Sequence, residues 1–141
     1  MTARLKGRRR TALRLLEDLG DGARASHRIE GVALVGSYAH GAEGMASDVD
    51  VLILTTDPDA VADSSWFLTL RPGSKLVRSK RWGPVRERRY RLRSGLLVEL
   101  GFAPLEWAAV PLDAGTERVL SDGHRIIYDT GALQVASTAA R

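Results

Sequence analysis

The chain has 141 residues, about the length of one domain, and its 44% hydrophobic and 27% charged residues are an ordinary globular balance. It contains no cysteine, which excludes disulfides and thiolate metal sites and fits a reducing compartment. The apolar runs are too short to cross a bilayer, and no apolar signal segment follows the basic N-terminus. These features predict a single cytoplasmic domain over residues 1–141 with no membrane partner.

The net charge of +4 is unevenly distributed along the chain. Residues 1–14 contain six basic residues and no acid, whereas residues 71–93 contain ten basic residues and one acid, Glu87. The rest of the chain is therefore net acidic. Basic segments attract the phosphates of nucleotides or nucleic acids, although for residues 1–14 solubility alone is the favoured explanation.

In the first half of the chain, leucines at roughly helical spacing predict an amphipathic helix over residues 3–19 that ends at Gly20-Asp21-Gly22. The apolar run at residues 31–35 predicts a buried strand. Residues 36–47 are rich in glycine, alanine and serine, which predicts a tight turn and a short helix. Residues 48–55 are β-branched and apolar, and they predict a second buried strand.

In the second half, a helix is predicted over residues 59–70, followed by a hairpin of residues 84–93 and 96–102 around Ser94-Gly95. We expect residues 104–121 to be partly helical, residues 125–128 to form a last strand, and residues 130–141 to be a frayed tail. Strands separated by helices, with one antiparallel hairpin, predict an α/β (α+β) fold in which a mixed β-sheet is flanked by helices.

Two carboxylates mark the start of the second predicted strand. Asp48 and Asp50 are two residues apart, so both side chains leave the same face, while Val49, Val51 and Ile53 point into the core. Neighbouring carboxylates repel each other unless a cation lies between them. Mg²⁺ is a hard cation that prefers such oxygen ligands. The pair therefore predicts a magnesium site.

The residues that follow the first predicted strand favour phosphate binding. Gly36 allows a sharp turn and a close approach of phosphate to the backbone. If a helix opens after Ser37, that serine is its N-cap, and the free N–H groups and the hydroxyl form an anion site. A phosphate cradle beside a magnesium site is what a metal-bound nucleoside triphosphate requires.

Glu99 is the only acid in the second hairpin strand, and it alternates with the apolar residues Val98, Leu100 and Phe102. If this strand lies beside the strand that carries Asp48 and Asp50, three carboxylates converge. Two Mg²⁺ ions could then activate an attacking hydroxyl and neutralise the leaving pyrophosphate. The alternative is that Glu99 is an exposed carboxylate paired with an arginine of the neighbouring strand. Glu106 is the rival third acid, but it follows a proline and is expected on a helix.

Arginines occupy both faces of the first hairpin strand. By parity, Arg86 and Arg88 share one face with Tyr90, and Arg89, Arg91 and Arg93 share the other. One face is a candidate guide for a triphosphate or an acidic acceptor. Protection of an edge strand from aggregation is an equal alternative.

The glycines, serines and aspartates of residues 36–50 together resemble the signature of the polymerase-β-like nucleotidyltransferase superfamily. The match is closest to its minimal nucleotidyltransferase branch, and it rests on three groups: Gly36-Ser37, His40-Gly41 and Ser47-Asp48-Val49-Asp50. Their spacing is that of the branch, and the resemblance covers about residues 28–103. Two positions depart from the pattern, because His40 replaces an arginine and Glu99 stands where an aspartate is frequent.

The resemblance implies a nucleotidyltransferase fold and a role for each group of residues. The nucleotide-binding positions are Gly36, Ser37, His40, Gly41 and Ser47. The catalytic, metal-binding positions are Asp48, Asp50 and Glu99, with two Mg²⁺ ions, which Mn²⁺ can replace. Ser47 is expected to cap the turn rather than to react, and its hydroxyl could support Asp48 and Asp50.

The resemblance also implies a reaction and its partners. The expected activity is transfer of a nucleoside monophosphate, AMP from ATP, to an acceptor hydroxyl on a protein tyrosine or serine, or on a small molecule such as an aminoglycoside. Minimal relatives act as antitoxins beside a helical ribonuclease toxin, so a toxin is a candidate protein acceptor. A binding module that neutralises a toxin without chemistry and a nucleic-acid binder that uses residues 71–93 remain the alternatives.

Overall fold

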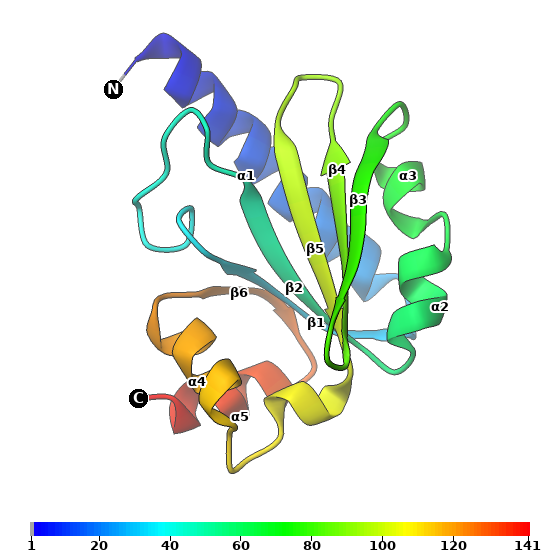
Figure 1. Ribbon diagram of the computed structural model, residues 1–141, viewed down its shortest axis with the longest axis vertical. Helices are drawn as coiled ribbons and strands as arrows, with labels where there is room; N and C mark the ends of the chain where they lie inside the picture. Colours follow the sequence, from blue (N-terminus) through cyan, green and yellow to red (C-terminus); the bar gives the residue numbers. More distant parts are fainter. Residues whose placement is uncertain (1) are drawn as a thin grey trace.

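The computed structural model describes residues 2–141, in which six strands form one mixed sheet (Figure 1). The strands are β1 (Ile29–Val35), β2 (Val49–Thr55), β3 (Lys75–Trp82), β4 (Val85–Arg91), β5 (Leu97–Ala103) and β6 (Arg125–Asp129). The helices are α1 (Ala3–Arg24), α2 (Pro58–Asp63), α3 (Trp66–Leu70), the 3₁₀-helix η1 (Leu105–Ala108), α4 (Ala114–Ser121) and α5 (Ala132–Ala139). The predicted mixed sheet flanked by helices is therefore confirmed.

The strand order in the sheet is β3-β4-β5-β2-β1-β6. All neighbouring strands are antiparallel except β2 and β5, which are parallel. The parallel pair lies in the middle of the sheet, and the chain needs α2, α3 and the β3–β4 hairpin to cross from β2 to β5 in the same direction. The starts of β2 and β5 consequently meet at one edge of the sheet.

Two cores cover the two faces of this sheet. On one face, α1, α2 and α3 pack over the apolar side chains of β1, β2, β4 and β5, among them Val49, Val51 and Ile53. On the other face, η1, α4 and α5 cover only one end of the sheet, where Leu52, Leu54 and Ala103 are buried. The opposite end of this second face has no helix over it (Figure 1), and the acidic residues at the start of β2 and β5 lie there.

The N-terminal helix is longer than the sequence predicts. Thr2 caps α1 by accepting a hydrogen bond from the Leu5 N–H at 3.1 Å, and the helix continues through Gly20 and Gly22 to Arg24. A Cβ atom at Gly20 would lie 3.1 Å from Ile127 of β6, so the glycine allows close packing of helix against sheet. Packing thus outweighs the cost of glycine inside a helix.

Three other local predictions are wrong. Residues 36–47 form turns and contain no helix, so Ser37 is not a helix N-cap. The helix predicted over residues 59–70 is interrupted at Ser64-Ser65, where the Ser64 hydroxyl donates to the Val61 carbonyl at 2.7 Å and ends α2. Strand β3 was not predicted, because its residues are exposed or half-buried and follow no apolar alternation.

The C-terminal segment is ordered in the structure, contrary to the predicted frayed tail. The Asp129 carboxylate accepts hydrogen bonds from the backbone N–H groups of Gly131, Leu133 and Gln134 at 2.8–3.0 Å, and these bonds hold the start of α5. Leu133 is 1% exposed and packs directly on Gly31 of β1. Among residues 2–141, no helix is both long and apolar enough to cross a membrane.

The docking of α5 predicts a contrast between two of its apolar residues. Leu133→Ala should lower the free energy of unfolding by about 2–5 kcal/mol, because it leaves a cavity against β1. Val135→Ala, at a position that is 58% exposed, should change it by less than about 0.5 kcal/mol. Urea denaturation of both variants measures the contrast, and equal effects would mean that the tail is frayed after all.

Candidate active site

The parallel pairing of β2 and β5 sets Asp50 directly opposite Glu99. Both side chains point to the face that lacks a helix at this end, because Val49, Val51, Val98 and Leu100 are buried on the other face. The convergence of these two predicted acids is therefore found in the structure. The rival Glu106 lies on η1, is exposed, and does not join them.

Asp50 lies in an unfavourable environment for a negative charge. Burial is the largest cause, followed by a hydrogen bond with Glu99 and by the charges of Glu99, Asp48 and Glu87, and together these raise the pKa of Asp50 to about 7. No basic side chain among the described residues forms an ion pair with Asp50. A bound cation would relieve this repulsion and restore the charged form.

Gly36 follows β1 and packs against the same carboxylate. Its φ is +72°, and a Cβ atom added there would lie within 2.3 Å of the Asp50 Oδ2 atom. Both the left-handed backbone and the close approach of a carboxylate exclude any side chain at this position. Glycine is therefore required at position 36 by the turn, as the sequence predicts, and also by the contact with Asp50.

The rest of residues 36–47 is anchored at several points. The Ser47 hydroxyl accepts a hydrogen bond from the Gly44 N–H at 2.8 Å and caps the turn, as predicted. The His40 Nδ1 atom lies 3.0 Å from the Asp122 carbonyl oxygen, at the end of α4, and therefore carries the proton in this contact. Gly41 has a φ of +74° and no atom near its missing Cβ.

Helix α1 also holds this loop. The Arg9 Nε atom lies 2.5 Å from Glu43 Oε1, and the Glu43 side chain is only 6% exposed. The second Glu43 oxygen and the Tyr38 hydroxyl are buried and have no hydrogen-bond partner among the described residues. Burial, the largest cause, raises the pKa of Tyr38, so its hydroxyl stays protonated. The Arg9–Glu43 ion pair therefore connects the loop to α1.

Two arginines lie among these acids, and one of them, Arg89, is on the strand next to Glu99, where the sequence offered an arginine as an alternative partner of that acid. Arg89 of β4 places its Nη2 atom 2.6 Å from Asp48 Oδ2 and its Nε atom 3.7 Å from Glu99 Oε1. Arg78 of β3 places its Nη2 atom 2.7 Å from Glu99 Oε1 and 2.8 Å from Glu87 Oε1. Strand parity gave the face of Arg89 correctly, but Arg78 lies on the strand that was not predicted.

The other arginines of β4 do not reach this site. Arg86 and Arg88 share the opposite face with the buried Tyr90, as parity predicts, and they pair with Asp59 and Asp63 of α2. These two carboxylates are exposed, so the pairs contribute little stability. These pairs connect α2 to β4 of the sheet. Of the β4 arginines, Arg89 is the one that contacts the acids of the site.

A hollow of about 440 Å³ opens beside Asp50 and Glu99. It is lined by Leu52 and Gly101 of the sheet and by two tryptophans, Trp107 of η1 and the 56%-exposed Trp82 of β3. Its remaining lining residues are Val35, Gly36, His40, Val51, Val85, Glu87, Val119 and Asp122. The site thus combines a glycine turn, carboxylates and a largely apolar hollow.

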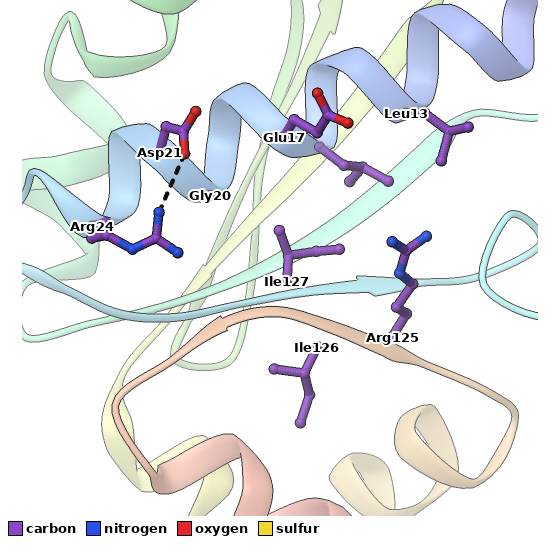
Figure 2. Close-up of a pocket in the computed structure, with 9 residues that line it drawn as sticks. Leu13, Glu17, Gly20, Asp21, Arg24, Arg125, Ile126 and Ile127 are labelled. Carbon is purple, nitrogen blue, oxygen red and sulfur yellow. Dashed lines mark hydrogen bonds and ion pairs between the residues drawn. The ribbon is translucent and has the colours of Figure 1, made fainter.

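A second hollow, of about 420 Å³, lies between α1 and β6. Figure 2 shows its apolar residues, Leu13, Ile126 and Ile127, and its charged rim, where Arg24 pairs with Asp21 at 3.2 Å. It contains none of the residues that carry the predicted motif. We therefore assign the candidate site to the first hollow.

The donor set suits a divalent cation only in part. Asp50 and Glu99 offer adjacent carboxylates, which are suitable oxygen ligands for Mg²⁺, and Asp50 has no compensating cation. Asp48 is directed to Arg89 instead. Accordingly, residues 2–141 contain no group of three side chains already placed to hold a metal ion. The three acids fit Mg²⁺ if Arg89 releases Asp48.

Comparison with known proteins gives a family match. A family model described as a nucleotidyltransferase domain matches residues 16–117, which include the glycine turn and all three acids. No curated protein matches the chain.

Two solved structures are similar to the chain. A cytoplasmic RNA terminal U-transferase is 16% identical with a TM-score of 0.53, over 85% of this chain and 33% of that one. An aminoglycoside 6-adenyltransferase from Bacillus subtilis is 17% identical with a TM-score of 0.49, over 67% of this chain and 35% of that one. The chain thus spans about a third of the length of these proteins. The first likeness supports the nucleotidyltransferase fold predicted from the sequence.

The two left-handed glycines of the loop give a matched prediction. Gly36→Ala and Gly41→Ala should each cost about 1–2 kcal/mol of backbone strain. Gly36→Ala should cost more, because its methyl group must also displace the Asp50 carboxylate. Urea denaturation gives both free energies of unfolding. Equal losses would show that Asp50 does not pack against the turn.

The pKa of Asp50 predicts a dependence of stability on pH in buffer without divalent ions. Between its ordinary value of 3.8 and about 7, the folded protein holds a proton that the unfolded chain releases. The free energy of unfolding should therefore fall as pH rises through this window. Asp50→Asn should reduce that fall. Asp59→Asn should retain the fall in stability, because Arg86 and Arg81 lower the pKa of Asp59 and so place its titration below this window.

Proposed function

The chain belongs to the nucleotidyltransferase domain family, and on this premise we propose that it transfers AMP from ATP to an acceptor hydroxyl, with Mg²⁺ held by Asp48, Asp50 and Glu99. The observation that carries the proposal is the parallel register that sets Asp50 beside Glu99, next to the Gly36 turn. We propose one catalytic domain over residues 1–141, with its core at about 28–103, in the cytoplasm, where ATP is available.

In this reaction, the acceptor oxygen attacks the α-phosphorus of ATP, and the bond from that phosphorus to the bridging oxygen breaks. Pyrophosphate leaves, and the hydroxyl proton passes to one of the three carboxylates. Bound Mg²⁺ would neutralise charge on the triphosphate and lower the pKa of the acceptor hydroxyl. Asp50, which is half-buried between other acids, is the residue that gains most from a nearby cation.

The glycine turn is proposed to receive the phosphates. Gly36 lies against Asp50, Ser37 follows it in the turn, and the Ser47 hydroxyl holds the loop by its hydrogen bond from the Gly44 N–H. His40, which lines the hollow, and Gly41, which follows it, would extend this surface. The apolar hollow between the two tryptophans is suited to the adenosine part, because aromatic side chains stack on nucleobases.

For the acceptor, we favour a hydroxyl of a partner protein, with a helical toxin as the candidate that the family resemblance implies. A small molecule such as an aminoglycoside is the alternative. Nucleic acid is a third, weaker candidate, which would use the basic residues of the segment 71–93. Each acceptor presents a hydroxyl, so the chemistry at the three acids is the same.

The proposal is tested with ATP labelled on its α-phosphate, Mg²⁺ and a cell lysate, followed by mass analysis of what gains AMP. Asp50→Asn and Glu99→Gln should each lower the rate of labelling by about 100-fold or more. Glu106→Gln is the matched control, because this acid lies on η1 outside the site, and it should leave the rate unchanged. Chelation of Mg²⁺ should stop labelling.

The alternative of an antitoxin that acts only by contact predicts a different result. If Asp48→Ala combined with Asp50→Ala still neutralises the partner toxin as the parent chain does, neutralisation does not need the transfer reaction. If the unmodified chain labels nothing in the lysate with Mg²⁺ or Mn²⁺ present, the enzymatic proposal is wrong.

A further inference from the structure

Arg89 is the side chain that joins two of the three proposed metal ligands. Its guanidinium contacts Asp48 at 2.6 Å and approaches Glu99 at 3.7 Å, and the three side chains are only 17–28% exposed. The register of the sheet imposes this contact, because Arg89 is the cross-strand partner of Glu99. In the free protein, one arginine therefore supplies positive charge where the proposed function places a divalent ion.

A guanidinium cannot lose its charge to make room for a metal. The proposed ligation of Asp48 thus requires Arg89 to move away from the Oδ2 atom it now contacts. Arg78, which contacts Glu99 from β3, is held in addition by Glu87 at 2.8 Å and so keeps a carboxylate partner when Glu99 turns to a metal. Within residues 2–141, Arg89 has no such second acceptor once both acids bind a cation.

The released Arg89 has unused donors. Its Nε atom is buried and has no hydrogen-bond partner among the described residues, since the contact with Glu99 is too long. A guanidinium presents a planar fork of donors that matches the oxygens of phosphate. The group that would arrive with the metal is a triphosphate, which offers those oxygens beside the same carboxylates.

We propose that Arg89 is exchanged between the carboxylates and the nucleotide: it pairs with Asp48 in the free protein and binds the triphosphate when the metal takes its place. This inference rests on the proposed function and deepens it by adding a nucleotide-binding residue. Arg89 then has two opposite effects on metal binding. It competes with a metal ion that binds without nucleotide, and it assists a metal ion that binds together with ATP.

The chain contains a closely matched control for this residue. Arg88 is the next residue on β4, carries the same charge and also pairs with an aspartate at 2.6 Å, but it lies on the opposite face with Asp63. Arg89→Gln and Arg88→Gln therefore change the net charge equally. Any difference in binding between the two variants is therefore due to the location of Arg89 in the site and not to the change in the net charge of the protein.

The experiment measures Mn²⁺ binding without nucleotide, by the loss of the free-ion electron paramagnetic resonance signal, and then the KM for ATP. Arg89→Gln should bind Mn²⁺ alone roughly tenfold more tightly and raise the KM roughly tenfold, as expected for one charge-assisted hydrogen bond in each state. Arg88→Gln should match the parent chain in both. Arg89→Lys should return Mn²⁺ affinity toward that of the parent, because it restores the competing charge.

The inference is overturned if Arg89→Gln and Arg88→Gln bind Mn²⁺ equally, or if Arg89→Gln leaves the KM unchanged. Should Arg89→Gln not fold, as judged by urea denaturation, Arg89→Lys decides the matter: a parental KM contradicts the exchange and a raised KM supports it. Failure of the proposed function looks different, since the unmodified chain would then transfer no AMP at all.

Discussion

The parallel pairing of β2 and β5 is the constraint on which the site depends. It places two carboxylates on adjacent strands at the same level, on the face of the sheet that η1, α4 and α5 leave uncovered. The core on the other face fixes the register, because a shift by one residue would bury Asp50 and Glu99 and expose Val51 and Leu100. The apolar core thus enforces an electrostatically unfavourable arrangement of acids.

The sequence was sufficient to predict the strands that are buried and the acids they carry. Period-2 alternation reveals which face of β2 and β5 meets the core, and the glycine–aspartate spacing identifies the loop. It could not reveal β3, whose side chains are mostly exposed and follow no apolar pattern. Nor could it show that α5 is ordered, since this depends on three backbone bonds to Asp129 and on Leu133 meeting Gly31.

The sequence also predicts the charge balance of the site only in part, because that balance depends on how the strands pair. Strand parity predicts which face each acid occupies, and their convergence was expected only if the two strands are neighbours; the ion pairs of Arg78 and Arg89 depend further on β3 and β4 lying next to β5 in register. With these arginines present, Asp48 and Glu99 are compensated and Asp50 is not. The repulsion that the sequence predicts is therefore concentrated on one carboxylate rather than shared by three.

Strand β4 shows how one arginine-rich segment supports both structure and chemistry. Alternation sends Arg86 and Arg88 to the exposed acids of α2, where solvent screens the pairs, and sends Arg89 to half-buried acids, where the interaction is stronger. The sequence left open a charged edge and a guide to the cleft. The edge interpretation is wrong, because β4 pairs with β3 on one side and with β5 on the other, and the guide to the cleft stays a prediction. Because β3 forms the outer edge, β4 is free to present Arg89 to the site.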